Sequence, residues 1–359
     1  IEKGLEIAFN EPRVTPHLEE EMTDVYAPHD AKELVASGNS SEKRFIDAIT
    51  DGLRLAMERH PELVLMGQDI ADYGGVFKIT NGFTDLFGKE RVRNTPLCES
   101  AIIGIGLGLS IKGMKAMVEM QFADFVSCGF NQIVNNLAKL HYRWGQNADV
   151  VIRMPTGGGV GAGPFHSQSN EAWFFHTPGL KIVYPSNPYD AIGLLLSSFE
   201  DPNPIMFFEH KALYRSLTAE VPDDYYTVPI GKARVHRSGS DVSIITYGNA
   251  VHWATECCDE MQVDADIIDL RTLLPLDYDA IEISIKKTGK VILLHEDTLT
   301  GGIGGELSAY ISEHLFEYLD GPVIRVASLD TPIPFAAELE AQFLPIERLR
   351  IQLEKLLRY

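Results

Sequence analysis

The feature that most restricts the fold is an alternation along the chain of short apolar segments with longer segments of helical periodicity. Apolar segments of strand length occur at residues 63–66, 115–120, 150–154, 181–184 and 205–208. Apolar residues recur at helical spacing in the segments 45–57, 125–142 and 189–198. Strands that alternate with helices form a mainly parallel sheet covered on both faces, so the pattern predicts an α/β fold.

The first predicted helix contains Phe45, Ile49, Leu53 and Met57, which recur every fourth residue. A polar cluster at residues 39–41 precedes this helix, and we expect it to cap the helix N-terminus. The first domain is therefore predicted to begin near this cluster.

Residues 211–240 separate two such alternations. They contain Pro222, Pro229 and Gly231 and show little periodicity, which is typical of a crossing between domains. The alternation then resumes with predicted strands at 242–247, 266–270, 290–295 and 323–327 and predicted helices at 251–261, 306–319 and 345–357. We predict a larger α/β domain at residues 41–220 and a smaller α/β domain at residues 221–359.

Residues 1–40 differ from both predicted domains. They are acidic, contain Pro12, Pro16 and Pro28, and lack a sustained apolar period. We expect a linker, or an arm that lies on a partner. Because the chain begins at Ile1 without an initiator Met, we also expect it to be part of a longer or processed protein.

The charge balance argues against several classes of partner. The chain has 31 basic and 51 acidic residues and a formal net charge of -20, which repels nucleic acids and anionic membranes. No apolar run reaches the roughly 20 residues of a membrane span, and the first ten residues lack the features of a signal peptide. The four cysteines form no CxxC pattern, which favours a reducing compartment over a zinc site or a disulfide framework.

A glycine-rich loop at residues 157–163 follows a predicted strand. Its sequence satisfies the G-x-G-x-x-A spacing of dinucleotide-binding loops, but residues 164–169 intervene before a helix can begin. We therefore expect a mobile or close-packed backbone loop that presents His166 at the carboxyl edge of the sheet, where ligands of such folds bind. The simpler alternative is a solvated loop histidine.

Glu99 is a second candidate for a chemical role. It lies at the start of an apolar segment, residues 101–111, that has the length of a helix. A carboxylate in the first turn of a helix is stabilised by the helix dipole and needs no further role. Because the neighbouring residues are apolar, we expect Glu99 instead to be buried and to have a chemical task.

The turn at residues 201–204, Asp-Pro-Asn-Pro, connects a predicted helix to a predicted strand. Its side-chain and backbone oxygens are also ligands of the kind that hard cations prefer. The chain contains no GxSxG, HExxH or P-loop motif, so the corresponding hydrolase, metalloprotease and nucleotide chemistries are not indicated.

Several short motifs, in their order along the chain, resemble the beta subunit of the decarboxylating component of 2-oxoacid dehydrogenase complexes. The motifs lie at Met66–Ile70, Gly74–Lys78, Arg93–Glu99, Gln121–Phe125, Phe165–Ser169, Ile268–Thr272 and Leu299–Gly302. The resemblance covers residues 41–359 and is closer to the branched-chain enzyme than to the pyruvate enzyme. Residues 1–40 resemble instead the C-terminal end of the partner alpha subunit, as in chains where alpha and beta are fused.

This resemblance implies a thiamin diphosphate-binding (pyrimidine) fold followed by a smaller transketolase C-terminal-like α/β domain. In that family the cofactor lies at the interface of alpha and beta, with an alpha2beta2 arrangement. The chain lacks the GDG and downstream Asn that hold the metal-bound diphosphate in thiamin enzymes. The diphosphate and Mg2+ ligands are therefore expected from the alpha part.

The resemblance also implies roles for individual residues. Glu99 matches the glutamate that hydrogen-bonds the aminopyrimidine ring and so promotes loss of the thiazolium C2 proton. Leu97 and Phe125 match positions that line the pyrimidine, although many relatives have Tyr in place of Phe125. His166 matches a loop histidine that assists acyl transfer to a lipoyl arm. A structural K+ site built mainly from backbone carbonyls matches Val150, Ser198, Asp201 and Asn203.

The expected activity is oxidative decarboxylation of a branched-chain 2-oxoacid, with reductive acylation of lipoamide on a dihydrolipoyl acyltransferase. The alternatives are the same chemistry on pyruvate or on a broad range of 2-oxoacids, a non-catalytic binding scaffold, and a nucleotide-binding dehydrogenase. We expect a cytoplasmic location in a bacterium or the mitochondrial matrix in a eukaryote, and no nucleic acid or membrane partner. The lipoyl and subunit-binding domains of the acyltransferase are expected partners. Acidic candidates for the docking of the basic subunit-binding domain are Glu313, Glu317, Asp320, Glu338 and Glu340.

Overall fold

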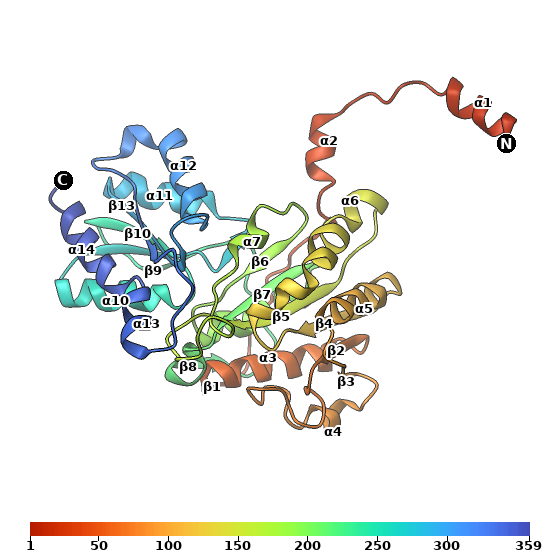
Figure 1. Ribbon diagram of the computed structural model, residues 1–359, viewed down its shortest axis with the longest axis horizontal. Helices are drawn as coiled ribbons and strands as arrows, with labels where there is room; N and C mark the ends of the chain where they lie inside the picture. Colours follow the sequence, from red (N-terminus) through yellow and green to blue (C-terminus); the bar gives the residue numbers. More distant parts are fainter.

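Two mainly parallel sheets, each with helices on both faces, follow an N-terminal arm in the computed structural model, which describes residues 1–359 (Figure 1). The arm contains α1 (Glu2–Asn10) and α2 (Leu18–Thr23). None of the helices combines the length and the apolar character that crossing a bilayer requires. The α/β class that the alternating pattern predicts is confirmed.

The first unit contains the larger sheet. Its elements are β1 (Ser40–Arg44), α3 (Phe45–Arg59), β2 (Leu63–Gly67), α4 (Phe83–Phe87), β3 (Val92–Asn94), α5 (Glu99–Ile111), β4 (Lys115–Glu119), η1 (Ala123–Gly129), η2 (Gln132–Leu137), α6 (Leu140–Trp144), β5 (Val150–Thr156), α7 (Ala172–Phe175), β6 (Lys181–Val183), α8 (Pro188–Glu200), β7 (Ile205–His210), α9 (Leu213–Ser216) and β8 (Thr218–Pro222).

The second unit contains the smaller sheet. Its elements are β9 (Arg234–Arg237), β10 (Val242–Thr246), α10 (Ala250–Met261), β11 (Ala265–Asp269), β12 (Thr272–Leu274), α11 (Tyr278–Thr288), β13 (Val291–Thr298), α12 (Gly304–His314), η3 (Phe316–Tyr318), β14 (Ile324–Ser328), α13 (Ala337–Phe343) and α14 (Ile346–Leu356).

The larger sheet has the strand order β12-β6-β7-β5-β4-β2-β3 and is parallel except for β12. All five residues of β2 are buried, because each face of the sheet is covered by helices. Leu63 and Leu65 pack in the core on the side of α3 and α8, whereas Val64 and Met66 pack in the core that includes α5. This burial on both faces explains why the strands read as continuous apolar segments rather than as alternating ones.

The smaller sheet has the order β14-β13-β10-β11-β9 and is parallel except for β9 at one edge. Helices α10 and α14 cover one of its faces, and α11 and α12 cover the other. The core beneath α11 and α12 is continuous with the core beneath α5 in the first unit. The two sheets therefore share one hydrophobic core.

The two units also share a strand. Strand β12 follows β11 of the smaller sheet in the chain, yet it pairs with β6 at the edge of the larger sheet, with Thr272 opposite Val183 and Leu274 opposite Ile182. The larger sheet is therefore completed by residues from the second unit.

The predicted cap at residues 39–41 is wrong. Ser40–Arg44 forms strand β1, which pairs antiparallel with β8, and Ser41 Oγ donates to Asp223 Oδ1 at 2.5 Å. Helix α3 begins at Phe45 after Arg44, whose side chain makes no capping hydrogen bond. Long-range pairing at this edge outweighs the local capping preference of the serines.

The single helix expected over residues 125–142 is divided in the structure. A 3-10 helix, η1, is followed by the wider π-type turns of η2 and then by the short helix α6. The helical spacing of the apolar residues survives in Val126, Ile133 and Leu140, which are all buried. The periodicity thus identified the buried face but not the change in helical winding.

The arm lies on its own chain from helix α2 onward. Ala27 and Asn203 exchange two hydrogen bonds, from Ala27 N to Oδ1 at 2.8 Å and from Nδ2 to Ala27 O at 3.1 Å. Further along, Leu34 N donates to Thr227 Oγ1 at 2.8 Å. Helix α1 extends away from both units (Figure 1), whereas α2 contacts α6 through the hydrogen bond from Tyr142 Oη to Glu21 Oε2 at 2.5 Å. From α2 onward the arm therefore contacts the first unit of its own chain, whereas the sequence suggests a linker or an arm that lies on a partner.

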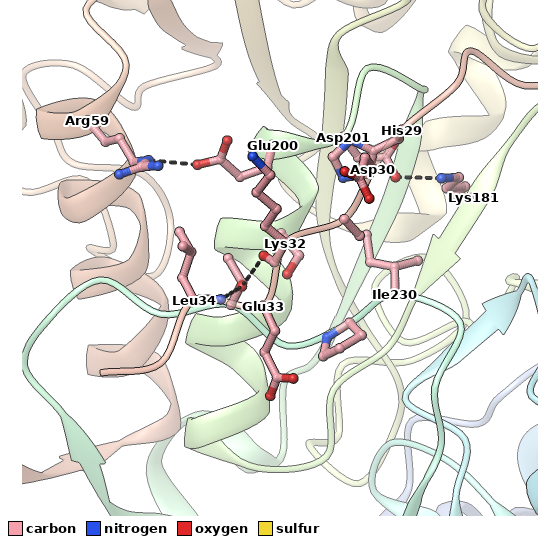
Figure 2. A pocket seen from close by; sticks show the side chains of 14 residues that line it. His29, Asp30, Lys32, Glu33, Leu34, Arg59, Lys181, Glu200, Asp201 and Ile230 are labelled. Carbon is pink, nitrogen blue, oxygen red and sulfur yellow. Dashed lines mark hydrogen bonds and ion pairs between the residues drawn. The ribbon is translucent and has the colours of Figure 1, made fainter. Parts of the chain in front are cut away.

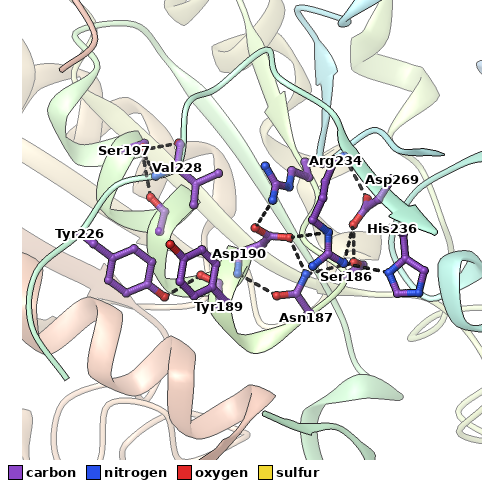
Figure 3. Close-up of polar contacts among 12 residues, drawn as sticks. Ser186, Asn187, Tyr189, Asp190, Ser197, Tyr226, Val228, Arg234, His236 and Asp269 are labelled. Carbon is purple, nitrogen blue, oxygen red and sulfur yellow. Dashed lines mark hydrogen bonds and ion pairs between the residues drawn. The ribbon is translucent and has the colours of Figure 1, made fainter. Parts of the chain in front are cut away.

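A network of two buried carboxylates and two partly buried arginines joins the two units beside α8 (Figure 3). Asp190 of α8 is fully buried and lies 2.9 Å from Arg271 Nη2 and 3.7 Å from Arg234 Nε. Asp269, also fully buried, accepts a hydrogen bond from Ser186 Oγ at 2.5 Å and lies 3.7 Å from Arg234 Nη2. Burial raises the pKa of Asp269 to about 6, as does the nearby Asp190. We call Asp190, Arg234, Asp269 and Arg271 the arginine network.

Candidate active site

The candidate site lies at the carboxyl edge of the larger sheet. Strands β2, β4 and β5 are parallel neighbours, so their carboxyl ends meet at one edge. Gln68 follows β2, the segment with Phe125 follows β4, and the glycine loop, Gly157–Gly163, follows β5. Chemically active side chains from three distant segments are therefore brought to the same edge.

Glu99 begins helix α5 at this edge and is only 8% exposed. Gln68 Nε2 donates to Glu99 Oε1 at 3.1 Å. The helix behind it is apolar along most of its length, and Ile102 and Ile103 are buried. As the apolar sequence indicates, the structure shields this carboxyl group from water, and Gln68 orients it.

Phe125 and His166 come together from segments about forty residues apart, as counted along the sequence. Their ring centroids are 5.7 Å apart in an edge-to-face arrangement, and His166 also lies edge-on to Phe122 at 4.7 Å. Both side chains are half-buried. Segment η1, which contains Phe125, packs against α5, which begins with Glu99. The structure thus brings Phe125 and His166 into contact and places Glu99 on the adjoining helix.

Leu97 differs from this group in its exposure to solvent. Its side chain is 80% exposed, in the short connection between β3 and α5. An exposed leucine next to a buried carboxylate leaves an apolar surface free at the mouth of the site.

The glycine loop has positive φ angles at Gly157, Gly159, Gly161 and Gly163. A Cβ atom at Gly157 would lie 2.1 Å from His210 Nε2, so a larger residue does not fit there. No helix follows the loop directly, because the next one, α7, begins at Ala172. The nucleotide-binding interpretation of the loop therefore has no helix N-terminus to hold a pyrophosphate.

The amides of this loop are occupied by carboxylates of the second unit. Gly158 N donates to Glu296 Oε1 at 2.5 Å, Gly159 N to Glu340 Oε1 at 2.9 Å, and Gly161 N to Glu340 Oε2 at 3.0 Å. Donors that would be needed for a phosphate are therefore already satisfied.

Four carboxylates gather where the two units meet behind the loop: Glu171, Glu296, Asp297 and Glu340, here called the carboxylate cluster. All four are buried. Burial, together with the nearby Asp297, raises the pKa of Glu171 well above its usual value. Burial also raises the pKa of Asp297, against a hydrogen bond from Thr298 N that lowers it. The cluster therefore favours the protonated form of at least some of its members.

Two basic residues of the first unit face this cluster. His210 Nε2 lies 2.5 Å from Glu296 Oε2. Burial alone would raise the pKa of Glu296, but His210 and the Gly158 amide lower it below its usual value. Lys211 Nζ donates to Gly157 O at 2.6 Å, and burial lowers the pKa of Lys211 to about 8. A cavity of about 290 Å3 lies beside the cluster, between Ser167–Ser169 and Ile333.

Sequence reasoning does not identify Gln68 or the carboxylate cluster as part of the site. Gln68 lies within the motif Met66–Ile70, but nothing in the sequence indicates that its side chain binds Glu99. Glu340 was expected on an acidic docking surface, and that prediction is wrong because Glu340 is 5% exposed and bonded to the glycine loop. A glutamate at a buried position of α13, between the apolar Leu339 and Phe343, was the available signal.

The residues of the expected K+ site lie at the opposite, amino edge of the larger sheet. Asp201 is the C-cap residue that follows α8, and Lys181 begins β6. The Asp201 carboxylate accepts from Lys181 Nζ at 2.5 Å and from Asn203 Nδ2 at 2.8 Å, and Ser198 Oγ donates to Leu194 O. Val150 is buried in β5 and can offer only its carbonyl. The side chains of this set are therefore already partnered. The ammonium group of Lys181, rather than a metal ion, supplies the positive charge beside Asp201.

A pocket of about 300 Å3 lies next to this corner, between residues 29–34 of the arm and α8 (Figure 2). Two ion pairs line it, since Arg59 Nε lies 2.7 Å from Glu200 Oε1 and Lys181 binds Asp201. No group of three or more His, Cys, Asp or Glu side chains in the chain is arranged to hold a metal ion. The pocket contains none of Glu99, Phe125 and His166 in its lining.

Comparisons with known families match both units. The model described as "Transketolase, pyrimidine binding domain" matches residues 41–216, and the one described as "Transketolase, C-terminal domain" matches residues 231–348. The structure is similar to that of a split-gene transketolase in an inactive beta4 tetramer, with a TM-score of 0.70 and 20% identity, over 88% of this chain and 98% of that one. At this identity the structural match supports the fold alone.

Curated relatives are much closer in sequence. The chain is 47% identical to the 2-oxoisovalerate dehydrogenase subunit beta of Bacillus subtilis, over 84% of this chain and 94% of that protein. It is 42% identical to the mitochondrial 2-oxoisovalerate dehydrogenase subunit beta 2 of Arabidopsis thaliana, over 84% of this chain and 86% of that protein. It is also 42% identical to the pyruvate dehydrogenase E1 component subunit beta of Bacillus subtilis, over 85% of this chain and 95% of that protein.

Proposed function

The chain belongs to the family of beta subunits of 2-oxoacid dehydrogenases, and from this membership we propose that it decarboxylates a branched-chain 2-oxoacid together with an alpha subunit. Identity to the 2-oxoisovalerate subunits supports the branched-chain substrate. The buried, oriented carboxylate of Glu99 is the observation that carries the proposal. Bound thiamin diphosphate supplies the carbon nucleophile and the electron sink that a side chain of the protein cannot provide.

Glu99 is proposed to hold a proton at its carboxylate against the ring nitrogen of the cofactor pyrimidine. A carboxyl group shielded from water shares a proton more strongly with a bound base than an exposed one does. The hydrogen bond from Gln68 leaves the second oxygen, Oε2, available for that contact. The position of Glu99 at the sheet edge, next to η1, supports this role.

Phe125 is proposed to pack on the pyrimidine, and Leu97 to line it from the exposed side of the site. The exposure of Leu97 supports a site that is completed by another chain. His166 is proposed to assist acyl transfer to a lipoyl group that enters from outside. Its ring is half-buried and lies edge-on to two phenylalanines. This position supports the proposal that the lipoyl group reaches His166 from solvent at the mouth of the site.

The diphosphate and its Mg2+ are proposed to bind to the alpha subunit, or to an alpha part fused before this chain. The residues of the expected K+ site do not fit a cation through their side chains, because Lys181 already partners Asp201. Potassium held there by backbone carbonyls stays a prediction, and no step of the reaction depends on it.

The substrate is the first point to test. The protein, purified with its alpha subunit, is expected to release CO2 from a panel of 2-oxoacids only when thiamin diphosphate is present, and fastest from a branched-chain one. A preference for pyruvate, or equal rates across the panel, supports the alternative substrates instead. Because the chain is 42% identical to a pyruvate dehydrogenase subunit as well, this panel decides between them.

The role of Glu99 is tested by Glu99→Gln, which keeps the size of the side chain but cannot share the proton. Exchange of the cofactor C2 proton is expected to slow by a factor of at least about 100, the size of a general acid–base contribution. Glu90→Gln is the matched control, since that carboxylate is 93% exposed. Wild-type exchange in Glu99→Gln would remove Glu99 from the mechanism.

The role of His166 is tested by separating two half-reactions. His166→Ala is expected to lower acylation of a lipoyl domain much more than decarboxylation with an artificial electron acceptor. Equal losses in both would indicate a defect in assembly rather than in acyl transfer.

The acyltransferase is proposed to dock on acidic residues of the second unit. Of the expected set, Glu313, Glu317, Asp320 and Glu338 are exposed and remain candidates, whereas Glu340 is not available. If docking is electrostatic, raising the salt from 50 to 500 mM shortens the Debye length from roughly 14 to 4 Å and should strongly slow association. An association rate that is insensitive to both salt and charge reversal at these four residues would contradict this surface.

A further inference from the structure

The glycine loop that precedes His166 is bound by a carboxylate that has no basic partner. Glu340 forms no ion pair, and its two oxygens accept from Gly159 N at 2.9 Å and Gly161 N at 3.0 Å. The side chain is 5% exposed. Burying a carboxylate is unfavourable unless its oxygens are hydrogen-bonded, so Glu340 depends on these two amides as much as the loop depends on Glu340.

Glu296 binds both ends of the longer segment that contains the glycine loop and His166. One oxygen, Oε1, accepts from Gly158 N at 2.5 Å and from Ser169 Oγ at 3.1 Å, on either side of His166 in the sequence. The first unit adds Asp124, the neighbour of Phe125, whose Oδ1 accepts from Gln168 N at 3.2 Å. The segment that carries His166 is therefore tied at its beginning, at its end, and to the segment of Phe125.

The second unit also contacts the loop sterically. A Cβ atom at Gly158 would lie 2.5 Å from Ile333 Cδ1, and one at Gly163 would lie 2.2 Å from Phe335 Cε1. The loop thus fits against residues just before α13, the helix that carries Glu340. Glycine is required here for close approach as well as for the positive φ angles.

A loop with this many glycines has a large conformational entropy when it is free. Ordering each residue costs roughly 1–2 kcal/mol, and glycine is at the upper end of that range. The hydrogen bonds from the loop amides to carboxylates are charge-assisted and offset part of this cost. Without them, the sequence 157–163 has few side chains with which to hold a single conformation.

We propose that Glu340, acting with Glu296, is a positioning residue that holds the glycine loop and so fixes His166 at the mouth of the site for acyl transfer. This inference rests on the proposed function for the role of His166. It adds that the second unit, through α13, sets the conformation of a loop that belongs to the first unit. Glu340 does not touch substrate or cofactor and acts only through the loop.

The test uses the protein assembled with its alpha subunit and loaded with thiamin diphosphate and Mg2+. Glu340→Ala removes both hydrogen bonds, and Glu340→Gln keeps one acceptor oxygen. Glu338→Gln is the matched control, because Glu338 lies on the same first turn of α13 but is exposed. Amide hydrogen exchange across residues 157–163 is measured alongside lipoyl-domain acylation and decarboxylation with an artificial acceptor.

In Glu340→Ala, exchange at the loop amides is expected to rise at least about tenfold, since charge-assisted hydrogen bonds are lost. Acylation is expected to fall about tenfold relative to decarboxylation, with Glu340→Gln intermediate and Glu338→Gln like the wild type. Wild-type loop exchange in both Glu340 variants would overturn the inference. So would equal losses in the two half-reactions, because a merely structural role lowers both.

The outcome is separable from that of the proposed function. If the wild type shows no thiamin-dependent decarboxylation, the proposed function fails, whereas loop exchange in the Glu340 variants still reports whether the carboxylate holds the loop. If the wild type is active and the loop exchange is unchanged by both substitutions, the positioning role alone fails.

Discussion

The arginine network and the carboxylate cluster both join the first unit to the second, but they balance charge differently. In the arginine network, Asp190 and Asp269 face Arg234 and Arg271, so acids and bases are equal in number. In the carboxylate cluster, Glu171, Glu296, Asp297 and Glu340 face only His210 and Lys211, and much of the hydrogen bonding comes from backbone amides of the glycine loop.

The difference indicates which interface is permanent and which depends on a loop. A buried ion pair with a full set of partners is strongly destabilised by removing one partner, so it fixes the two units against each other. A cluster with excess acid is stable only while its protons and its amide donors are in place. Because those donors lie in the loop that carries His166, the state of the cluster and the position of the loop are coupled.

The strongest test of the comparison is Arg271→Met, which leaves the fully buried Asp190 without its nearest cation. Unfolding in urea is expected to show a loss of about 3 kcal/mol, because an uncompensated buried charge is costly. The double variant Asp190→Asn with Arg271→Met should lose less than the sum of the single variants. Additive losses would show that the two residues do not act as a pair.

A second test uses the pH dependence of stability. Burial raises the pKa of Glu171 to about 8, so from about pH 4.5 to 8 the native state binds a proton that the unfolded state has released. The contribution of Glu171 to stability is therefore present at low pH and is lost as the pH rises through this window. Between pH 6 and 8 the wild type is expected to lose roughly 2 kcal/mol more stability than Glu171→Gln.

Asp269→Asn provides the comparison within the arginine network. Burial raises the pKa of Asp269 only to about 6, so most of its pH-dependent contribution lies below the measured interval. The change in stability between pH 6 and 8 should therefore be nearly the same in Asp269→Asn and the wild type. If Glu171→Gln also shows the wild-type change, the carboxylate cluster does not hold an extra proton.

The smallest expected effects come from two serines that donate to carboxylates, one in each region. Ser186→Ala removes the hydrogen bond to Asp269, and Ser169→Ala removes the one to Glu296. Each is expected to cost about 1 kcal/mol of unfolding free energy. Only Ser169→Ala should also lower lipoyl-domain acylation relative to decarboxylation, because only Ser169 lies beside the loop of His166. A similar loss of acylation in Ser186→Ala would erase the distinction between the regions.

Much of the fold could be predicted from the sequence because the central strands are buried on both faces. Segments such as 63–66 and 205–208 are apolar throughout, and this pattern identifies parallel strands directly. The edge strands could not be found in this way. Ser40–Arg44 is polar and forms a strand only because Thr218–Pro222 lies beside it, which is a long-range pairing without a local signal.

The candidate site was predictable in part for the same reason. Glu99 stands out because an acid next to a long apolar segment conflicts with the surrounding pattern. Glu340 also has apolar neighbours, but the sequence places it on the surface, because α13 is short and alternates apolar with polar residues and the burial of Glu340 depends on the glycine loop of another unit. Contacts between residues almost two hundred positions apart leave no trace in local periodicity.

The shared strand has a consequence for synthesis of the chain on the ribosome. The residues of the first unit up to β8 leave the ribosome before β12 does, so β6 is exposed as an unpaired sheet edge until Thr272–Leu274 follows. The roughly fifty intervening residues take about 3–10 s to translate at usual rates. During that interval the nascent first unit offers a ready template for pairing with another chain, and a factor that binds nascent sheet edges would act there.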